Sequence, residues 1–302
     1  MLVNASVIQG LFTNLKTTFN KAFAAVEPVW PKIAMEVPST GASNDYSWLS
    51  MFPKMREWIG EKYVKALEAF NYQLVNRDFE ATVEVKRKHI EDDQIGIYSP
   101  LAKDAAHSAK TWPDELIFEV VNGAFASLCF DGQYFIDTDH PVGDGVVSNK
   151  ITVKLKAGTL AEAQASFGAA KTKMREFKDD EGRPLGLRPN VLLVPPALED
   201  TANLLMDSER LQDGKQNPYR NSAEVVVGDY LTDPDAWFLL DTTRPVKPFI
   251  FQPRKRPVFV SQVNMESDDV FMKAVYKYGA ESRGNAGYGF WQLAVGSDGS
   301  TG

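Results

Sequence analysis

The sequence predicts an α+β protein, because helical and strand patterns occupy separate stretches of the chain. Residues 8 to 26 carry apolar side chains at helical spacing. Phe79 to Val85 instead alternates apolar and polar residues, as in a strand with one solvent-exposed face. A third stretch, from Thr159 to Leu205, predicts a helix, a fully apolar strand and a second helix. This last pattern is typical of a compact α/β unit within the larger fold.

Composition indicates an ordinary folded protein and excludes several classes. The 302 residues are 44% hydrophobic and 24% charged, which excludes a disordered chain, a collagen and a coiled-coil rod. Thirty-three Lys and Arg against forty Asp and Glu give a net charge of -7. That balance argues against a protein whose main task is to wrap nucleic acid, because backbone binding needs a basic face.

Cysteine usage and hydropathy bear on the compartment. Cys129 is the one cysteine, so an internal disulfide framework and a Cys-based zinc cluster are excluded, which favours the cytosol. The N-terminus is polar where a signal peptide needs an unbroken apolar run, and no stretch of about 18 apolar residues occurs. We therefore expect neither export by that route nor a membrane span.

The N-terminal stretch predicts an amphipathic arm. Ile8, Phe12, Leu15 and Phe19 fall on one helical stripe, with Phe23 beside it. Burying a large apolar side chain stabilises by ~1.5–3 kcal/mol, whereas ordering the backbone of each residue costs ~1–2 kcal/mol, so this helix needs a surface to lie on. Residues 28–44 contain three prolines and a run of turn residues, which predicts a tether. The surface that covers the stripe can belong to another subunit.

Residues 46–88 are rich in aromatic side chains, among them Trp48, Trp58, Tyr63 and Phe70. The region has β-like runs but no second layer of its own in sequence. It therefore suits a projecting hairpin or a sheet edge.

The longest helical pattern begins at Ser99-Pro100, with Ser as the N-cap and Pro at the first helical position. Its apolar face continues to Cys129, and Pro113 is expected to kink or restart the helix. Thr159 and Glu162 then form a capping box, Asn190 to Val194 is a buried strand, and further strands are expected at 225–227 and 237–240. From Pro245 onward we expect strands again, with a Gly-rich loop at Gly284 to Gly289.

The strongest candidate for chemistry is a loop with Asp137, Asp139, His140 and Asp144, which could bind a divalent metal and serve a metal-dependent hydrolase. Its spacing differs from a calcium loop, because Pro141 stands where a ligand is needed and Val142 where glycine is needed. The favoured interpretation is a loop whose Asp side chains cap backbone amides. His89 and His107 suit solvated or structural roles, and Cys129 suits a buried thiol. We expect no catalytic centre, no metal and no cofactor.

Two short charged runs stand out. Arg254, Lys255 and Arg256 lie between prolines and could contact phosphate. The net negative charge of the chain instead favours a solvated turn or an ion-pair donor between subunits. Glu91, Asp92 and Asp93 are their acidic counterpart and are interpreted as a helix start. The two runs could pair between subunits.

Several short sequence segments are distinctive when taken together. They are Phe23–Pro38 (F-A-A-V-E-P-V-W-P-K-I-A-M-E-V-P), Tyr46–Leu49, Phe52–Pro53, Arg56–Gly60, Phe79–Val85, Ile90–Gln94, Asp131–Gln133 and Asp137–Pro141. Together they resemble the major head subunit of Mu-like phages and prophages. Pro189–Pro196 also resembles the strand-to-helix passage common in phage capsid proteins. The resemblance covers essentially the whole chain.

The resemblance implies the tailed-phage major capsid fold of the Hong Kong type. On this sequence it implies an N-terminal arm at 1–45, an extended β-hairpin loop at 46–88, a peripheral domain with a long spine helix at 89–150, an axial α/β domain at 151–245, and a return to the peripheral domain with a C-terminal tail at 246–302. Function would then reside in interfaces. The expected subunit-interface residues are Ile8, Phe12, Leu15, Phe19, Phe23, Trp48, Trp58, Tyr63, Phe70, Arg254, Lys255 and Arg256.

The implied activity is self-assembly through hexamers and pentamers into an icosahedral head that encloses double-stranded DNA without sequence-specific binding. We expect assembly in the cytoplasm of a bacterial host, a place in the virion, and no membrane partner. Nothing marks the Lys, Asn and acid that crosslink some members of this fold, so a noncovalent shell is expected. No scaffold-like charged helical prefix precedes the arm, so a separate scaffold protein and a portal are expected partners. An alternative is another phage structural part, a tail tube or sheath.

Overall fold

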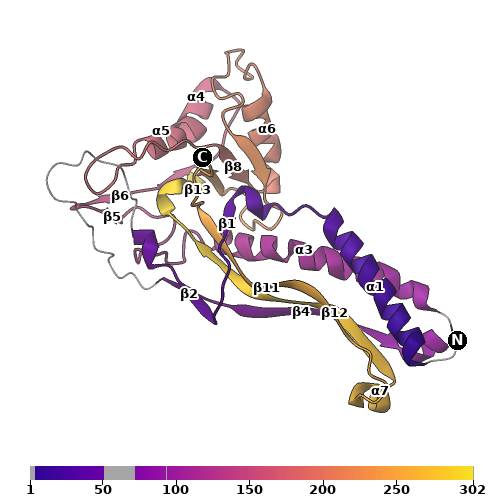
Figure 1. Ribbon diagram of the computed structural model, residues 1–302. Helices are drawn as coiled ribbons and strands as arrows, with labels where there is room; N and C mark the ends of the chain where they lie inside the picture. Colours follow the sequence, from indigo (N-terminus) through magenta and orange to yellow (C-terminus); the bar gives the residue numbers. More distant parts are fainter. Residues whose placement is uncertain (1–3, 51–71, 93, 302) are drawn as a thin grey trace.

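The computed structural model describes residues 4–50, 72–92 and 94–301. The described strands form one four-stranded sheet, one five-stranded sheet and two two-stranded sheets, and Figure 1 shows their arrangement. The helices are α1 (Ala5–Ala25), α2 (Arg87–Glu91), α3 (Tyr98–Asn122), α4 (Leu160–Ala163), α5 (Ala169–Arg175), α6 (Glu199–Asp207) and α7 (Asp268–Lys273). The strands are β1 (Ala34–Glu36), β2 (Ser43–Asp45), β3 (Gln73–Val75), β4 (Arg77–Lys86), β5 (His140–Val142), β6 (Gly145–Val147), β7 (Lys150–Val153), β8 (Val191–Val194), β9 (Glu224–Val227), β10 (Trp237–Leu240), β11 (Phe249–Gln262), β12 (Val275–Tyr288) and β13 (Ala294–Thr301).

The first sheet is long and has four strands in the order β1-β11-β12-β4. Its centre is the antiparallel hairpin of β11 and β12, which carries helix α7 at its far end (Figure 1). The strand predicted at Phe79 to Val85 is confirmed as part of β4, and its side chains alternate between exposed and partly buried. β4 pairs with β12 along its whole length, so this part of residues 46–88 is a sheet edge.

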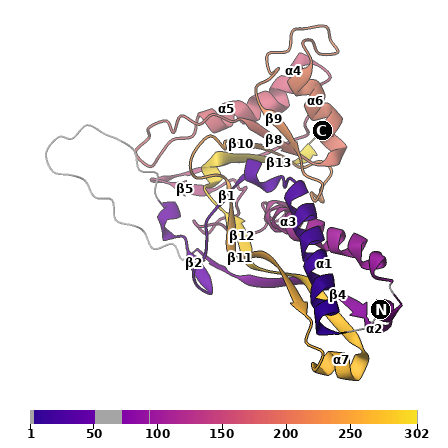
Figure 2. The ribbon, with the colours of Figure 1, turned by 45° about the vertical axis from the view of Figure 1, so that its right-hand side comes forward.

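Helices α3 and α1 lie side by side on this sheet, and the rotated view in Figure 2 shows the same arrangement. Trp112 of α3 contacts the rings of Phe79 and Phe251, with centroids 5.1 and 5.6 Å apart, which fixes α3 over β4 and β11. The expectation that Pro113 restarts the helix is wrong, because α3 runs through it as one element. The helix ends at Asn122 with Gly123 as its C-cap, short of the expected Cys129.

The second sheet has five strands in the order β7-β13-β10-β8-β9 and forms the buried centre of the α/β unit. Every residue of β8 and β10 is buried, as a strand covered on both faces requires. The capping box of Thr159 and Glu162 is confirmed, although the helix after it passes through a π-turn at Gln164–Gly168 before α5. β13 lies between β7 and β10, so the end of the chain belongs to this sheet.

The expected Gly-rich loop at Gly284 to Gly289 is wrong, because most of that run lies inside β12. A Cβ atom at Gly284 would lie 2.5 Å from the carbonyl oxygen of Gln252, and one at Gly287 would lie 2.6 Å from a methyl group of Leu74. Glycine is therefore used here for close approach of neighbouring chain segments rather than for a flexible loop.

The stretch after Pro245 also contains helix α7, which the sequence analysis assigned to strands. Ser267 precedes two acidic residues, Asp268 and Asp269, in the first turn of α7. This sequence pattern predicts the start of a helix. None of the described helices combines the length and hydropathy needed to cross a bilayer.

Candidate assembly surfaces

The apolar stripe of the arm is covered by its own chain. Asn4 caps α1 by accepting a hydrogen bond from the amide of Val7 at 2.9 Å. Ile8, Phe12, Leu15 and Phe19, all expected at a subunit interface, are between 0% and 4% exposed. The sequence left open which surface covers them, and in this conformation side chains of the same subunit cover all but a small part of each.

Two groups of side chains provide that cover. The N-terminal half of the stripe packs with Tyr276 and Tyr278 of β12, whose rings meet Phe12 edge-on at 6.4 and 6.0 Å. The C-terminal half places Phe19 against Phe259 of β11 at 5.5 Å and among alanines of α3. Phe23 is only partly buried: it stacks on Phe19, and the Nζ atom of Lys110 lies 4.8 Å from its ring.

The two ends of the aromatic segment 46–72 are fixed beside each other. β2 and β3 pair antiparallel, and the amide of Tyr46 donates to the carbonyl of Tyr72 at 2.8 Å. The Tyr46 hydroxyl donates to Oε1 of the buried Gln252 at 2.7 Å, whose amide nitrogen donates to Asn76 at 2.8 Å. Burial raises the pKa of Tyr46 to about 12, so the hydroxyl remains a donor at neutral pH.

Of the aromatic residues expected at an interface in this segment, Trp48 is described. It is 37% exposed, and its ring lies 6.0 Å from Tyr46 and 6.1 Å from Phe290. Trp58, Tyr63 and Phe70 lie outside the described residues.

The basic run Arg254 to Arg256 is exposed on β11, but it is a strand rather than the expected turn. Nζ of Lys255 lies 2.8 Å from a carboxylate oxygen of Glu281, and Arg256 pairs with Glu36. Both pairs are exposed, so each contributes ~0–1 kcal/mol to stability. The acidic run is also placed differently from the expectation, because Glu91 ends α2 rather than starting a helix.

The long sheet leaves backbone groups open to a partner. β4 is an edge strand, and within the described ranges no strand pairs with the outer side of β11 beyond Pro253. Exposed edges invite pairing with another chain. Charged side chains such as Glu80 and Glu84 on the wet face of β4 limit wrong pairing.

The loop that suggested a metal is used for capping. Asp137 accepts hydrogen bonds from the amides of Tyr134 at 3.1 Å and Thr138 at 2.7 Å. Partial burial raises the pKa of Asp137, but these backbone hydrogen bonds outweigh it and lower the pKa overall. Asp139 accepts from the Thr138 hydroxyl at 2.9 Å. This supports the capping interpretation.

His140 belongs to a different group of side chains, one that the sequence analysis missed. Among the described residues, Cys129, Asp131 and His140 bring one possible ligand atom each within 4.8 Å of the others. Asp131 accepts from Nδ1 of His140 at 2.7 Å and from the Cys129 thiol at 3.0 Å. His140 is fully buried and stacks on Trp291, with centroids 4.0 Å apart.

Hydrogen bonding accounts for this cluster without a metal. The amide nitrogen of Asn149 donates to three carbonyls at 2.9 to 3.3 Å, which turns its oxygen toward Nε2 of His140 at 3.2 Å. Both ring nitrogens of His140 therefore lie within hydrogen-bond distance of side-chain oxygens. Burial raises the pKa of the Cys129 thiol, and the Asp131 charge raises it further, so the thiol is not activated. Burial also raises the pKa of Asp131, but hydrogen bonds and the charge of His140 outweigh it and lower the pKa overall.

Helix α7 carries the other residues that the sequence analysis missed. Phe271 and Met272 are 85% and 75% exposed at the far end of the β11–β12 hairpin. The signal in the sequence was the Ser267 cap with its acidic first turn, which predicts a helix between two strands.

Comparison with known proteins agrees with this geometry. The family model for the Mu-like prophage major head subunit gpT matches residues 8–163, 157–231 and 232–301. The Mu-like prophage FluMu major head subunit of Haemophilus influenzae is 32% identical over 292 residues, which cover 97% of this chain and 73% of that protein. The major capsid protein of Escherichia phage Mu is 31% identical over 295 residues, which cover 98% of this chain and 74% of that protein.

Solved structures give the same answer for the fold. The procapsid of bacteriophage JBD30 matches with a TM-score of 0.63 and 33% identity over 98% of this chain and 76% of that one. The JBD30 capsid matches with a TM-score of 0.60 and 31% identity over 71% of this chain and 94% of that one. A virus-like particle from Pyrococcus furiosus shares the fold at 10% identity, with a TM-score of 0.54 over 95% of this chain and 98% of that one.

The fold predicted from the sequence, the α+β fold of tailed-phage capsid proteins, is therefore confirmed. The relatives are head and capsid subunits, which are structural proteins rather than enzymes. The chain belongs to the family of major head subunits of Mu-like phages and prophages, the structural proteins from which the phage capsid is built.

Proposed function

We propose that this chain forms hexamers and pentamers that close into an icosahedral head around double-stranded DNA. Assembly would take place in the cytoplasm of the bacterial host, with a separate scaffold protein and a portal. The existence of both a procapsid and a capsid of the related JBD30 phage supports assembly before a later maturation step.

The observation that carries the proposal is the long sheet with its unpaired edges. Along β4 and the outer part of β11, backbone donors and acceptors face away from the chain's other described strands. A neighbouring subunit that supplies a strand would satisfy these groups, and many such weak contacts sum to a stable closed lattice. Trp48 and the Arg254 to Arg256 run are proposed to add contacts at the same interfaces. The net charge of -7 supports enclosure of DNA without tight binding along its backbone.

Negative-stain microscopy with sedimentation tests the proposal, using the purified protein alone and after co-expression with a candidate scaffold. Closed shells, or pentamers and hexamers that convert to shells, are the expected result. Boiled shells should run as a 33.6 kDa monomer on a denaturing gel, because no covalent crosslink is expected. A persistent monomer under both conditions, or open tubes instead of shells, would contradict the proposal.

A further inference from the structure

Helix α7 presents two large apolar side chains that the rest of the chain leaves uncovered. Phe271 and Met272, here called the tip knob, are 85% and 75% exposed. Val270 beside them is 5% exposed and packs into the same cluster as Ile8 and Phe12 of α1. Two adjacent apolar side chains held out of the core mark an interaction site more strongly than scattered ones do.

The tip knob is held in place rather than loosely attached. Asp269 pairs with Nζ of Lys277 at 2.8 Å and with Nζ of Lys273 at 3.4 Å, which ties α7 to β12. The helix closes at Ala274, whose amide donates to the carbonyl of Val270 at 3.1 Å. Because Val270 is anchored inward, α7 keeps Phe271 and Met272 turned outward, as a preorganised contact should.

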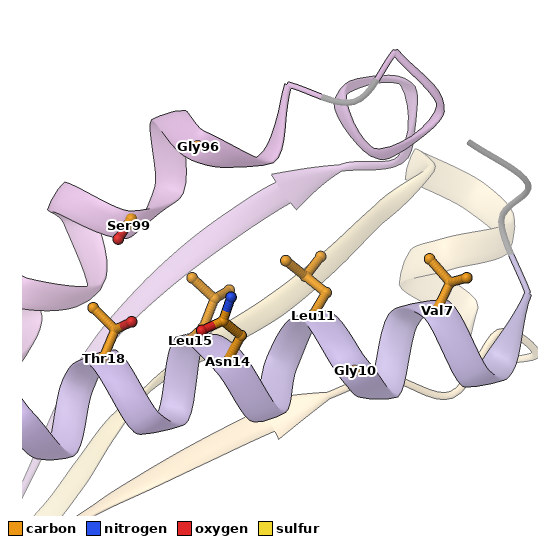
Figure 3. Close-up of a pocket in the computed structure, with 8 residues that line it drawn as sticks. All are labelled: Val7, Gly10, Leu11, Asn14, Leu15, Thr18, Gly96 and Ser99. Atoms are coloured by element: carbon orange, nitrogen blue, oxygen red, sulfur yellow. The ribbon is translucent and has the colours of Figure 1, made fainter.

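The same chain carries a groove that suits such a knob. A cavity of about 530 Å³ lies between α1 and the turn that leads into α3 (Figure 3). Val7, Leu11 and Leu15 line it from successive turns of α1, and Gly96 and Ser99 line the other side. The cavity size is within the range of ~300–1,000 Å³ that is usual for binding pockets.

Two glycines in the lining of this groove have open space beside them. A Cβ atom added at Gly10 or at Gly96 would meet no other atom within 4 Å. Gly10 lies within α1, where glycine costs ~0.5–1 kcal/mol of helix stability relative to alanine. A residue that weakens the helix and leaves room beside it is what a docking groove needs.

We propose that the tip knob of one subunit docks into the α1 groove of a second copy of this chain. The inference rests on the proposed self-assembly, and it names one of the contacts that hold the shell. Knob and groove are different surfaces of one chain, so the contact is heterologous and links each copy to a next one. The aliphatic floor of the groove matches the apolar knob, and Asn14 and Thr18 form a polar rim around it.

Disulfide trapping between two variants that each carry one added cysteine tests the contact directly. Gly10→Cys and Met272→Cys subunits are mixed, assembled and oxidised, and the shells are run on a nonreducing gel. Mixed shells should give covalent dimers, whereas shells of either variant alone should give monomers, because the native Cys129 is buried. Shells without mixed dimers, or dimers from Met272→Cys alone, would overturn the docking.

A second pair of variants measures the contribution of the contact. Gly10→Leu fills the groove, and Gly10→Ala is its matched control because it strengthens the helix with little added bulk. Gly10→Leu and the double variant Phe271→Ser/Met272→Ser should each raise the concentration needed for assembly roughly tenfold or more, and combining them should add little. Unfolding midpoints of the isolated subunits verify that each variant folds.

The outcomes separate this inference from the proposed function. If wild-type protein forms shells and the knob and groove variants assemble equally well, the docking is refuted and the capsid function stands. If wild-type protein forms no shells alone or with a scaffold, the proposed function fails and the docking fails with it.

Discussion

Replacing Phe12 with Ala tests whether α1 is held to its own subunit by the contacts described above. The Phe12 side chain is 4% exposed, and it lies between the rings of Tyr276 and Tyr278. Its removal leaves a hole between α1 and the hairpin. The rest of the α1 stripe remains in place, so the expected effect is weaker docking of the helix rather than loss of the fold.

The magnitude follows from the packing. Buried Phe→Ala substitutions cost ~3–5 kcal/mol, which includes the cavity left behind. Two edge-on ring contacts are lost, each worth ~0.5–1.5 kcal/mol beyond buried area, which places Phe12 toward the upper part of that range. A tenfold change in an equilibrium corresponds to ~1.4 kcal/mol. Undocking of α1 should therefore become roughly a hundredfold to a few thousandfold more frequent.

Amide hydrogen exchange read by mass spectrometry measures this undocking peptide by peptide. Peptides from α1 should lose protection in the Phe12→Ala variant, whereas peptides from β8 and β10 in the other sheet should keep it. Lys16→Ala is the matched control, because Lys16 is exposed on the same helix and its loss should change stability by less than ~0.5 kcal/mol. If α1 is as protected in Phe12→Ala as in wild type, the stripe is not what holds the arm.

Two further substitutions test the interior. Asp131→Asn should destabilise the subunit by ~1–3 kcal/mol at pH 7, because it replaces the buried carboxylate that accepts hydrogen bonds from His140 and from the Cys129 thiol. The folded pKa of Asp131 is lowered, so its stabilisation is complete above its ordinary pKa of ~4 and is lost as the pH falls through the folded value. Urea unfolding should thus show the gap between variant and wild type narrowing as the pH falls below ~4, with exposed Asp139→Asn as the control; a gap that does not narrow refutes the contribution of the Asp131 charge. Gly284→Ala should destabilise by ~1–3 kcal/mol in the same assay, because its Cβ would meet the Gln252 carbonyl at 2.5 Å, and an unchanged midpoint would refute that close approach.

Local sequence patterns predicted which helices and strands form better than they predicted which of them pair or pack together. The alternation at Phe79 to Val85, the capping box at Thr159 and the apolar run of β8 are encoded within a few residues, and all three are confirmed. The pairing of β4 with β12 joins residues about 200 positions apart along the chain, so no local signal announces it. The restart expected at Pro113 fails for a related reason: tertiary packing of α3 on the sheet outweighs the one backbone hydrogen bond that proline removes.

The candidate assembly surfaces likewise divide into features that local sequence patterns predict and contacts that only the structure shows. The stripe of Ile8, Phe12, Leu15 and Phe19 could be read from helical spacing, but spacing does not say which surface covers it. The hydrogen-bond partners of His140, Asp131 and Asn149, lie nine residues before and after it, but neither forms a motif with it. Phe271 and Met272 could have been found through the Ser267 helix start, although only the structure shows that they are uncovered.

Intramolecular docking of the arm changes where contacts between subunits should be sought. The cluster that buries Ile8 and Phe12 also buries Val270 of α7, so the arm and the hairpin tip stabilise each other. An arm that left this cluster would uncover its own stripe and also release the helix that holds the tip knob. In the proposed assembly, docking of α1 would keep the apolar stripe from premature association and would leave the smaller pair, Phe271 and Met272, exposed for contact. In the proposed assembly, contacts through such limited surfaces would each be weak, so a stable shell would depend on the sum of many of them.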